Sequence, residues 1–221
     1  MKHKKSKIQV QFNRASHRMI EEIYIKSLKV QFMKKSFTTI DTARDQFGEY
    51  PRGINHIGIT VPNIDHATDF FKRALGAKWC YDGLTLDDEP RQGQIIELQL
   101  GLPKGSKIIR QRMLRLGNGP GLELFEIEAP TQASPLKLSD FGINHMSVYC
   151  DDIEGSLTRI INAGGKALDQ LHDNSRHEDS EGSSSIYTLS PWGMLIELQS
   201  IPNGYYYDEH SEATAWIPQR L

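Results

Sequence analysis

Several features that would assign a protein to a specialised class are scarce in these 221 residues. Only two cysteines occur, Cys80 and Cys150, with no Cys-x-x-Cys pair, and isolated cysteines are typical of a reducing compartment. No apolar run approaches the roughly 18 residues that a membrane-spanning helix needs. The lysines near the N-terminus are not followed by the apolar core of a secretory signal. We therefore expect a cytoplasmic protein with no membrane association.

The chain also lacks an excess of charge of either sign. Its 26 lysines and arginines nearly balance 28 aspartates and glutamates, and the formal net charge is −2. A general nucleic-acid binder would show a domain-wide basic excess, so we expect no nucleic-acid partner. Nucleophilic catalysis has little support, because no Gly-x-Ser-x-Gly motif occurs and neither cysteine has a local activating motif.

Residues 1–52 differ in composition from the rest. Over residues 1–35, many lysines and arginines are accompanied by only two acidic residues, Glu21 and Glu22. A basic arm can contact membrane or nucleic acid, but the favoured interpretation is an appendage, or a translated stretch upstream of a natural start at Met33. A polar connector follows, up to Pro51.

The remainder is organised by a repeat. Gly-Ile-Asn-His occurs at residues 53–56 and again at 142–145. The first copy continues as His-Ile-Gly-Ile-Thr-Val-Pro-Asn-Ile-Asp and the second as His-Met-Ser-Val-Tyr-Cys-Asp-Asp-Ile-Glu. Self-similarity of this kind indicates a duplicated structural unit. Each copy predicts a strand followed by a capped helix.

Periodicity predicts a β-α-β-β-β unit in each half. The four strands of the first unit are expected at residues 54–61, 77–81, 108–116 and 122–127, and those of the second at 143–150, 166–171, 186–189 and 194–199. A further short strand is expected at residues 94–100 of the first half. The first helix has one apolar stripe, formed by Ala67, Phe70, Phe71, Ala74 and Leu75. In the second helix, Leu157, Ile160 and Ile161 are expected on one face.

The expected fold class is α+β, with two paired βαβββ modules forming a cupped mixed sheet and helices on the outside. The predicted divisions are a basic extension and connector (1–52), a first module (53–130), a linker (131–139), a second module (140–202) and an aromatic tail (203–221).

Four residues occupy matching places in the two units. His56 and His145 lie in the first strand of each unit, whereas Glu123 and Glu197 lie in the last strand, flanked by apolar residues. A carboxylate in a largely buried strand is costly unless it is paired or bound to a cation. Two imidazoles and two carboxylates without a thiolate suit one divalent ion with octahedral N/O coordination, namely Ni, Co, Zn, Mn or Fe. The cupped sheet is therefore expected to surround a metal site.

Other histidines and carboxylates fit ordinary positions better. His172 and His177 lie in a polar loop and are expected to be solvated, and Glu126 and Glu128 are expected on the exposed face opposite Glu123. A lone strand histidine is usually a core or surface residue. The shared place of the four residues in a duplicated unit favours ligation.

With these motifs the chain resembles the vicinal-oxygen-chelate superfamily, which includes glyoxalase I, methylmalonyl-CoA epimerase, extradiol dioxygenases and the fosfomycin and bleomycin resistance proteins. The resemblance covers about residues 53–202 and rests on the paired modules, the His-Ile-Gly-Ile-Thr-Val-Pro-Asn opening and the closing Pro-Trp-Gly-Met-Leu-Ile-Glu-Leu. It implies that His56, Glu123, His145 and Glu197 are the metal ligands. Leu-Pro-Lys-Gly at 102–105 and Leu-Arg-Leu-Gly-Asn-Gly-Pro at 114–120 resemble a branch containing cyclitol epimerases.

The resemblance implies a metal-dependent lyase or isomerase of the glyoxalase or epimerase type. Such an enzyme removes a proton next to a carbonyl and stabilises the resulting metal-bound enediolate. Glu197 is the first choice for the general base and Glu123 the second. One alternative is a ring-cleaving Fe(II) dioxygenase, against which the fourth ligand argues. The other is a non-catalytic protein that binds a small molecule such as an antibiotic.

The expected partner is a small-molecule substrate with vicinal oxygens. Arg112, Tyr187 and Trp192 are candidate substrate contacts, as are the tyrosines at 205–207, although each also fits a structural role. The resemblance leaves open whether the four ligands meet within one chain or across a homodimer, because relatives do both.

Overall fold

The computed structural model describes residues 51, 53–213 and 215–219. The basic stretch at residues 1–35 lies outside the described residues. Within the described ranges, every helix is too short or too polar to traverse a lipid bilayer.

The first helix, α2 (Ile64–Leu75), forms where the apolar stripe predicts it. Asn63 caps it by accepting hydrogen bonds from the backbone N–H groups of Asp65 and His66. Gly76 ends it with φ 69°, a conformation that favours glycine. Phe70 and Phe71 are fully buried. The stripe therefore anchors α2 to the core.

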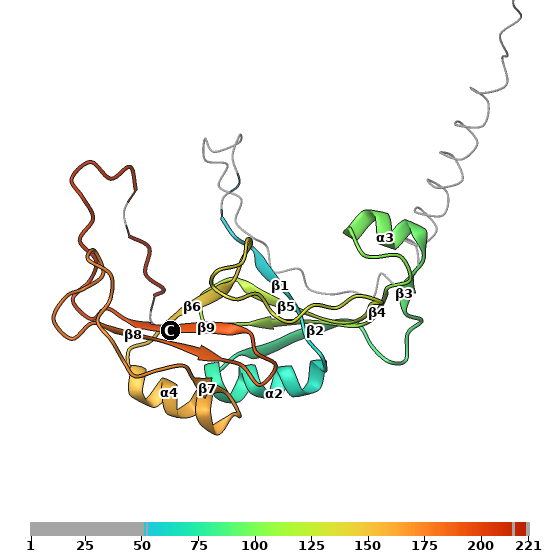
Figure 1. Ribbon diagram of the computed structural model, residues 1–221, viewed down its shortest axis with the longest axis horizontal. Coiled ribbons are helices and arrows are strands. Elements are labelled where there is room, and N and C mark those ends of the chain that lie inside the picture. The colour runs from blue at the N-terminus through green and yellow to red at the C-terminus, as the bar shows by residue number, and fades with distance from the viewer. Residues whose placement is uncertain (1–50, 52, 214, 220–221) are drawn as a thin grey trace, which may run out of the picture. The chain divides into compact units, whose positions relative to one another are not determined.

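Two mixed sheets build the two modules (Figure 1). The first has the order β1-β5-β4-β2, with β3 paired to β4. Its strands are β1 (His56–Thr60), β2 (Lys78–Leu84), β3 (Arg91–Gln92), β4 (Lys107–Arg115) and β5 (Gly121–Glu128). The second has the order β6-β9-β8-β7. Its strands are β6 (His145–Tyr149), β7 (Lys166–Ala167), β8 (Ser184–Leu189) and β9 (Leu195–Ser200).

The same pairing recurs in both sheets. The first strand of each module runs parallel to the last strand, and the remaining pairs are antiparallel. Between β1 and β5, Gly58 pairs with Glu123; between β6 and β9, Ser147 pairs with Glu197. In both modules the histidine therefore lies one diagonal step from the glutamate. The α+β class and the paired modules are confirmed.

One continuous core joins the modules on their helix-covered side. Figure 1 shows α2 and α4 (Ile153–Asn162) on the same side of the two sheets. Trp192 of the second module packs edge-to-face on Phe70 and Phe71, with ring centroids 5.4 and 5.5 Å apart, which is a favourable aromatic geometry. Cys150 is free and buried in this core, as a small apolar side chain would be.

Two local expectations are wrong. Residues 94–100, expected as a strand, form the helix α3 (Gln94–Leu100), which ends at Gly101 with φ 65°. The apolar run is too short for periodicity to separate strand from helix. Ile161 was expected beside Ile160 on the buried face of α4, but it is 50% exposed, whereas Ile160 is fully buried.

Candidate metal centre

The first module brings His56 and Glu123 together on the sheet face opposite α2. Nε2 of His56 lies 3.2 Å from Oε2 of Glu123. Gly121 pairs with His56 across the two strands, and a Cβ there would lie 2.8 Å from the Met113 sulfur and 3.3 Å from the His56 Cβ. Glycine at 121 therefore leaves room for the imidazole beside the carboxylate.

The second module repeats the pair. Nε2 of His145 lies 3.6 Å from Oε2 of Glu197, and both side chains are partly buried. Leu195 pairs with His145, so the imidazole lies over a leucine here rather than over a glycine. The two pairs thus share their register but differ in their surroundings.

The asparagine of the repeated tetrapeptide contacts the histidine that follows it. Asn55 Oδ1 lies 2.8 Å from Nδ1 of His56, and Asn144 Oδ1 lies 2.6 Å from Nδ1 of His145. An amide oxygen only accepts hydrogen bonds, so Nδ1 carries the proton and the Nε2 lone pair stays free. Metal-binding histidines are commonly oriented by such an acceptor. The signal for this role is present in the sequence, because the asparagine is part of the repeat.

Glu123 is also held by neighbours on its own sheet. Gln111 of β4 donates from Nε2 to Glu123 Oε1 at 2.5 Å. Arg91 of β3 donates to the Gln111 amide oxygen at 3.0 Å. Because Arg91 donates to the amide oxygen of Gln111, the amide nitrogen of Gln111 is the atom that faces Glu123. Neither Gln111 nor Arg91 belongs to a motif, so the sequence alone does not predict their role.

Glu197 has a phenol as its neighbour. Tyr187 pairs with Glu197 across β8 and β9, and burial, together with this nearby carboxylate, raises the pKa of Tyr187. The Tyr187 and His145 ring centroids lie 5.5 Å apart. A phenol that stays protonated can donate to a carboxylate. Tyr187, predicted as a substrate contact, therefore lies at the second pair.

The donor types and spacing in each pair fit neighbouring ligands of one divalent ion. With metal–ligand bonds of about 2.1 Å, two ligands at a right angle lie about 3.0 Å apart, close to the 3.2 and 3.6 Å observed. Each pair supplies two donors. Among the residues that the structure describes, no group of three or more His, Cys, Asp or Glu side chains converges on a common point. Within the described residues, the two pairs are therefore separate candidate half-sites.

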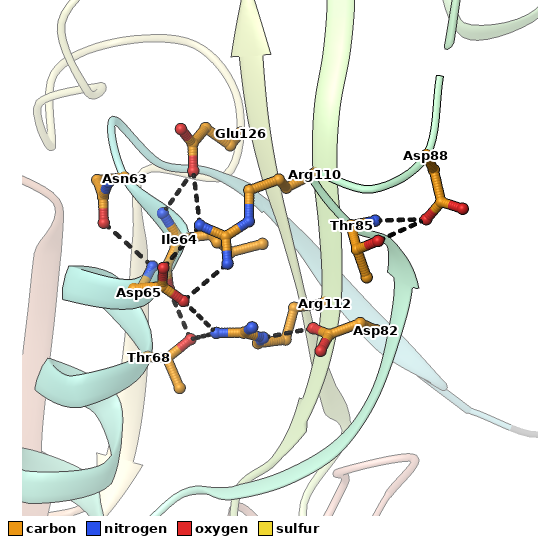
Figure 2. Close-up of polar contacts among 10 residues, drawn as sticks. All are labelled: Asn63, Ile64, Asp65, Thr68, Asp82, Thr85, Asp88, Arg110, Arg112 and Glu126. Atoms are coloured by element: carbon orange, nitrogen blue, oxygen red, sulfur yellow. Dashed lines mark hydrogen bonds and ion pairs between the residues drawn. The ribbon is translucent and has the colours of Figure 1, made fainter. Parts of the chain in front are cut away.

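Arg112 lies on the other face of the first sheet. Its guanidinium donates to Asp82 at 2.5 Å, to Asp65 at 2.9 Å and to Thr68 at 3.1 Å (Figure 2). Arg110 donates two further hydrogen bonds to Asp65, at 2.7 and 2.8 Å. These arginines hold the pKa of the Asp65 carboxyl at about 2. The positive charge of Arg112 is thus balanced by Asp65 and Asp82, near the start of α2. Arg112 lies on the sheet face opposite His56 and Glu123, so it does not point toward the predicted substrate.

The other candidates have structural contacts. Trp192 packs in the core, as described above. Tyr206 donates to the Asp179 carbonyl at 3.0 Å, and its own carbonyl lies 3.0 Å from Nδ1 of His177. Glu126 lies opposite Glu123 as expected, but it is partly buried and accepts from the Ile64 N–H at 2.9 Å, at the start of α2. His172 has a carbonyl contact at Nδ1, with Asp173 at 2.9 Å.

Comparison with known proteins agrees with this architecture. A family model described as the Glyoxalase/Bleomycin resistance protein/Dioxygenase superfamily matches residues 55–180. A 2-epi-5-epi-valiolone epimerase from an Actinomyces species is 29% identical over 169 residues, covering 75% of this chain and 88% of that protein. A glyoxalase family protein from Bacillus cereus shares the fold with a TM-score of 0.55 and 17% identity, covering 71% of this chain and 98% of that one.

Proposed function

Because the chain belongs to the glyoxalase/bleomycin resistance protein/dioxygenase superfamily, we propose that it is a divalent-metal-dependent epimerase or isomerase. The reaction removes a proton from a carbon next to a carbonyl and returns it to the other face of that carbon or to its neighbour. The observation that carries the proposal is the pair of matching half-sites, each with a histidine, a glutamate and an orienting asparagine. The similarity to a 2-epi-5-epi-valiolone epimerase supports this reaction class.

His56, Glu123, His145 and Glu197 would hold the metal. A divalent ion bound there supplies Lewis-acid stabilisation of the negative charge that develops on vicinal oxygens. The chain's own groups set the geometry, because Asn55 and Asn144 point the two Nε2 atoms toward the site. Gln111 keeps Glu123 in place through its 2.5 Å hydrogen bond.

Glu197 is the proposed general base. It faces the open side of the second sheet beside His145, and its neighbour Tyr187 can donate to it or release it. Glu123 is more firmly held, by Gln111 and Arg91 in series, so it suits a fixed ligand. This contrast supports assigning proton transfer to Glu197 and ligation alone to Glu123.

A second copy of the chain would complete each site. In one chain the half-sites stay apart, and two donors are too few for a catalytic ion, which takes at least three protein ligands. Apolar side chains of α3 are also exposed to solvent, because Ile95 is 68% exposed and Leu98 is 76% exposed. Figure 1 shows α3 on the side of the first sheet away from α2. His56 and Glu123 lie on that side too, because the alternating residues Ile59, Leu122 and Leu124 of their strands are buried on the helix side. In the proposed homodimer, the first module of one copy faces the second module of the other.

The function is tested with metal-stripped protein reloaded with Ni, Co, Zn, Mn or Fe. We expect one ion per chain, and metal-dependent incorporation of deuterium from heavy water into small α-hydroxy ketones. Protein that binds none of these ions would contradict the proposal. Metal binding with ring cleavage of a catechol, and no proton exchange, would favour the dioxygenase alternative.

A further inference from the structure

A cavity of about 670 Å³ lies beside the second half-site. One wall is the face of the second sheet opposite the helices, where Leu189 pairs with Leu195 and Tyr187 lies on a neighbouring position. Leu168, just after β7, also lines this wall. The other wall is the linker between the modules, through Leu136 and Leu138. The volume falls within the range of about 300–1,000 Å³ that is typical of small-molecule sites. The linker thus forms one wall of a cavity as well as a connection between the modules.

The cavity adjoins the second half-site through residues that neighbour its histidine and glutamate. Tyr187 lines the cavity and pairs directly with Glu197 across β8 and β9. Leu195 also lines it and pairs directly with His145 in the sheet register. A molecule held by its oxygens at His145 and Glu197 would therefore extend its remaining part into the cavity.

The residues that line the cavity determine which chemical groups of a bound molecule fit there. Apolar side chains, chiefly leucines from the sheet and linker together with Pro135 and Trp192, form more than half of the lining. The polar residues that line the cavity are Ser134, Lys137, Asp169, Gln170, His172 and Tyr187. Hydroxyl groups facing the leucines would lose their hydrogen bonds to water without replacement, which is costly. An aliphatic or aromatic group would gain free energy from burial against the same leucines.

We propose that the substrate carries an apolar substituent next to its vicinal-oxygen unit, and that Leu136, Leu138 and Leu168 determine this specificity. The inference rests on the proposed function for the position of the oxygens. It goes beyond that function by naming the substrate class, an α-hydroxy ketone or related compound with a hydrocarbon or aromatic group. A polyhydroxylated ring, expected from the cyclitol epimerase branch, would place hydroxyl groups against these leucines, where they lose hydrogen bonds to water.

Two α-hydroxy ketones test the inference by binding alone. 2-Hydroxyacetophenone and hydroxyacetone share the same oxygen unit, but only the first carries a phenyl group. Their affinities are measured by calorimetry on the full chain, with and without metal, so that turnover is not required. We expect 2-hydroxyacetophenone to bind at least about tenfold more tightly, which corresponds to about 1.4 kcal/mol.

Leu168→Asp and Leu136→Asp place a charge on either wall of the cavity. Both side chains are partly exposed, at 51% and 40%, so the fold should tolerate the change. Each variant should lose the preference for the phenyl compound and keep its affinity for hydroxyacetone. Ile161→Asp is the control, because Ile161 is equally exposed but lies on α4, away from the cavity.

Equal affinity for the two ketones, or a preference unchanged by Leu168→Asp, overturns the inference. Loss of the dimer in Leu168→Asp, measured by light scattering, also overturns it, because a second copy would then be the occupant. The proposed function fails separately: if the phenyl compound binds as predicted but metal-loaded protein exchanges no proton in either ketone, the cavity assignment stands and the reaction does not.

Discussion

Asn144 Oδ1 lies 2.6 Å from Nδ1 of His145 and so fixes which nitrogen of that imidazole is free to bind a metal. Asn55 has the same relationship to His56 at 2.8 Å. The repeated Gly-Ile-Asn-His therefore places a candidate metal ligand beside the group that orients it. In each module, the parallel pairing of the first and last strands then brings that ligand to a glutamate.

Removing either asparagine side chain should weaken metal binding. Asn55→Ala and Asn144→Ala are each expected to lower the affinity for Co or Zn about 10- to 100-fold, because the imidazole loses the acceptor that orients it. Asn55→Asp keeps an acceptor and should recover most of the affinity. Asn118→Ala is the matched control, since Asn118 donates to the Gln219 carbonyl instead. Unchanged metal affinity in both alanine variants would contradict the orienting role.

Gln111→Leu should also weaken metal binding, by about tenfold, because Glu123 loses a hydrogen bond to a charged acceptor worth roughly 1.5–3 kcal/mol. Gln132→Leu serves as the control, since Gln132 donates to the Ile127 carbonyl. Calorimetric titration with Co measures both. A metal affinity equal to that of the control would show that Gln111 does not position Glu123.

Glu197→Gln should lower proton exchange at least about 100-fold, as expected for a lost general base, while most of the metal stays bound. Glu123→Gln should instead lower metal content. Exchange is followed by proton resonance intensity in heavy water, and metal content by elemental analysis. Full exchange in Glu197→Gln would remove Glu197 from the base role and make Glu123 the candidate.

Acid should weaken the contacts at the start of α2. The pKa of Asp65 is lowered from 3.8 to about 2 by Arg110 and Arg112, so the ionised carboxylate stabilises the fold above pH 3.8 and this contribution is lost as the pH falls through about 2. Because Asp65 is 60% exposed, Asp65→Asn should cost only about 1 kcal/mol at neutral pH, and the difference should vanish near pH 2.

Denaturant unfolding at several pH values measures this contribution. Asp69→Asn is the control, because it removes only a surface pair with Arg73 four residues away, and such pairs contribute about 0.2–0.5 kcal/mol. A difference between Asp65→Asn and wild type that persists at pH 2 would show that the carboxylate acts by something other than its charge.

The parts of the fold that follow from the sequence are those with long or duplicated patterns. The apolar stripe of α2 and the capped start of this helix lie where the pattern predicts them. The seven residues of α3 are too few to distinguish a helical from a strand periodicity. In the described part of the chain, no strand pairs with them. The position of Arg112 follows from alternation with the buried Leu114, two residues away on the same face.

The residues of the candidate site also fall into those that the sequence predicts and those that only the fold reveals. A duplicated histidine and glutamate are visible in the sequence because the two copies can be compared. Gln111, Arg91 and the linker leucines have no counterpart in a repeat, so only the folded chain brings them to the site. The role of His56, Glu123, His145 and Glu197 as ligands of one ion remains a prediction.

Complementation between two inactive chains tests whether His56, Glu123, His145 and Glu197 form one site across a dimer. One chain carries His56→Ala and Glu123→Gln, and the other carries His145→Ala and Glu197→Gln. Each alone should be inactive. If the sites form across the dimer, refolding an equal mixture should restore about one quarter of the wild-type proton exchange, because half of the dimers are mixed and each has one complete site. A mixture as inactive as its components, although mixed dimers form, would contradict a site shared between two copies.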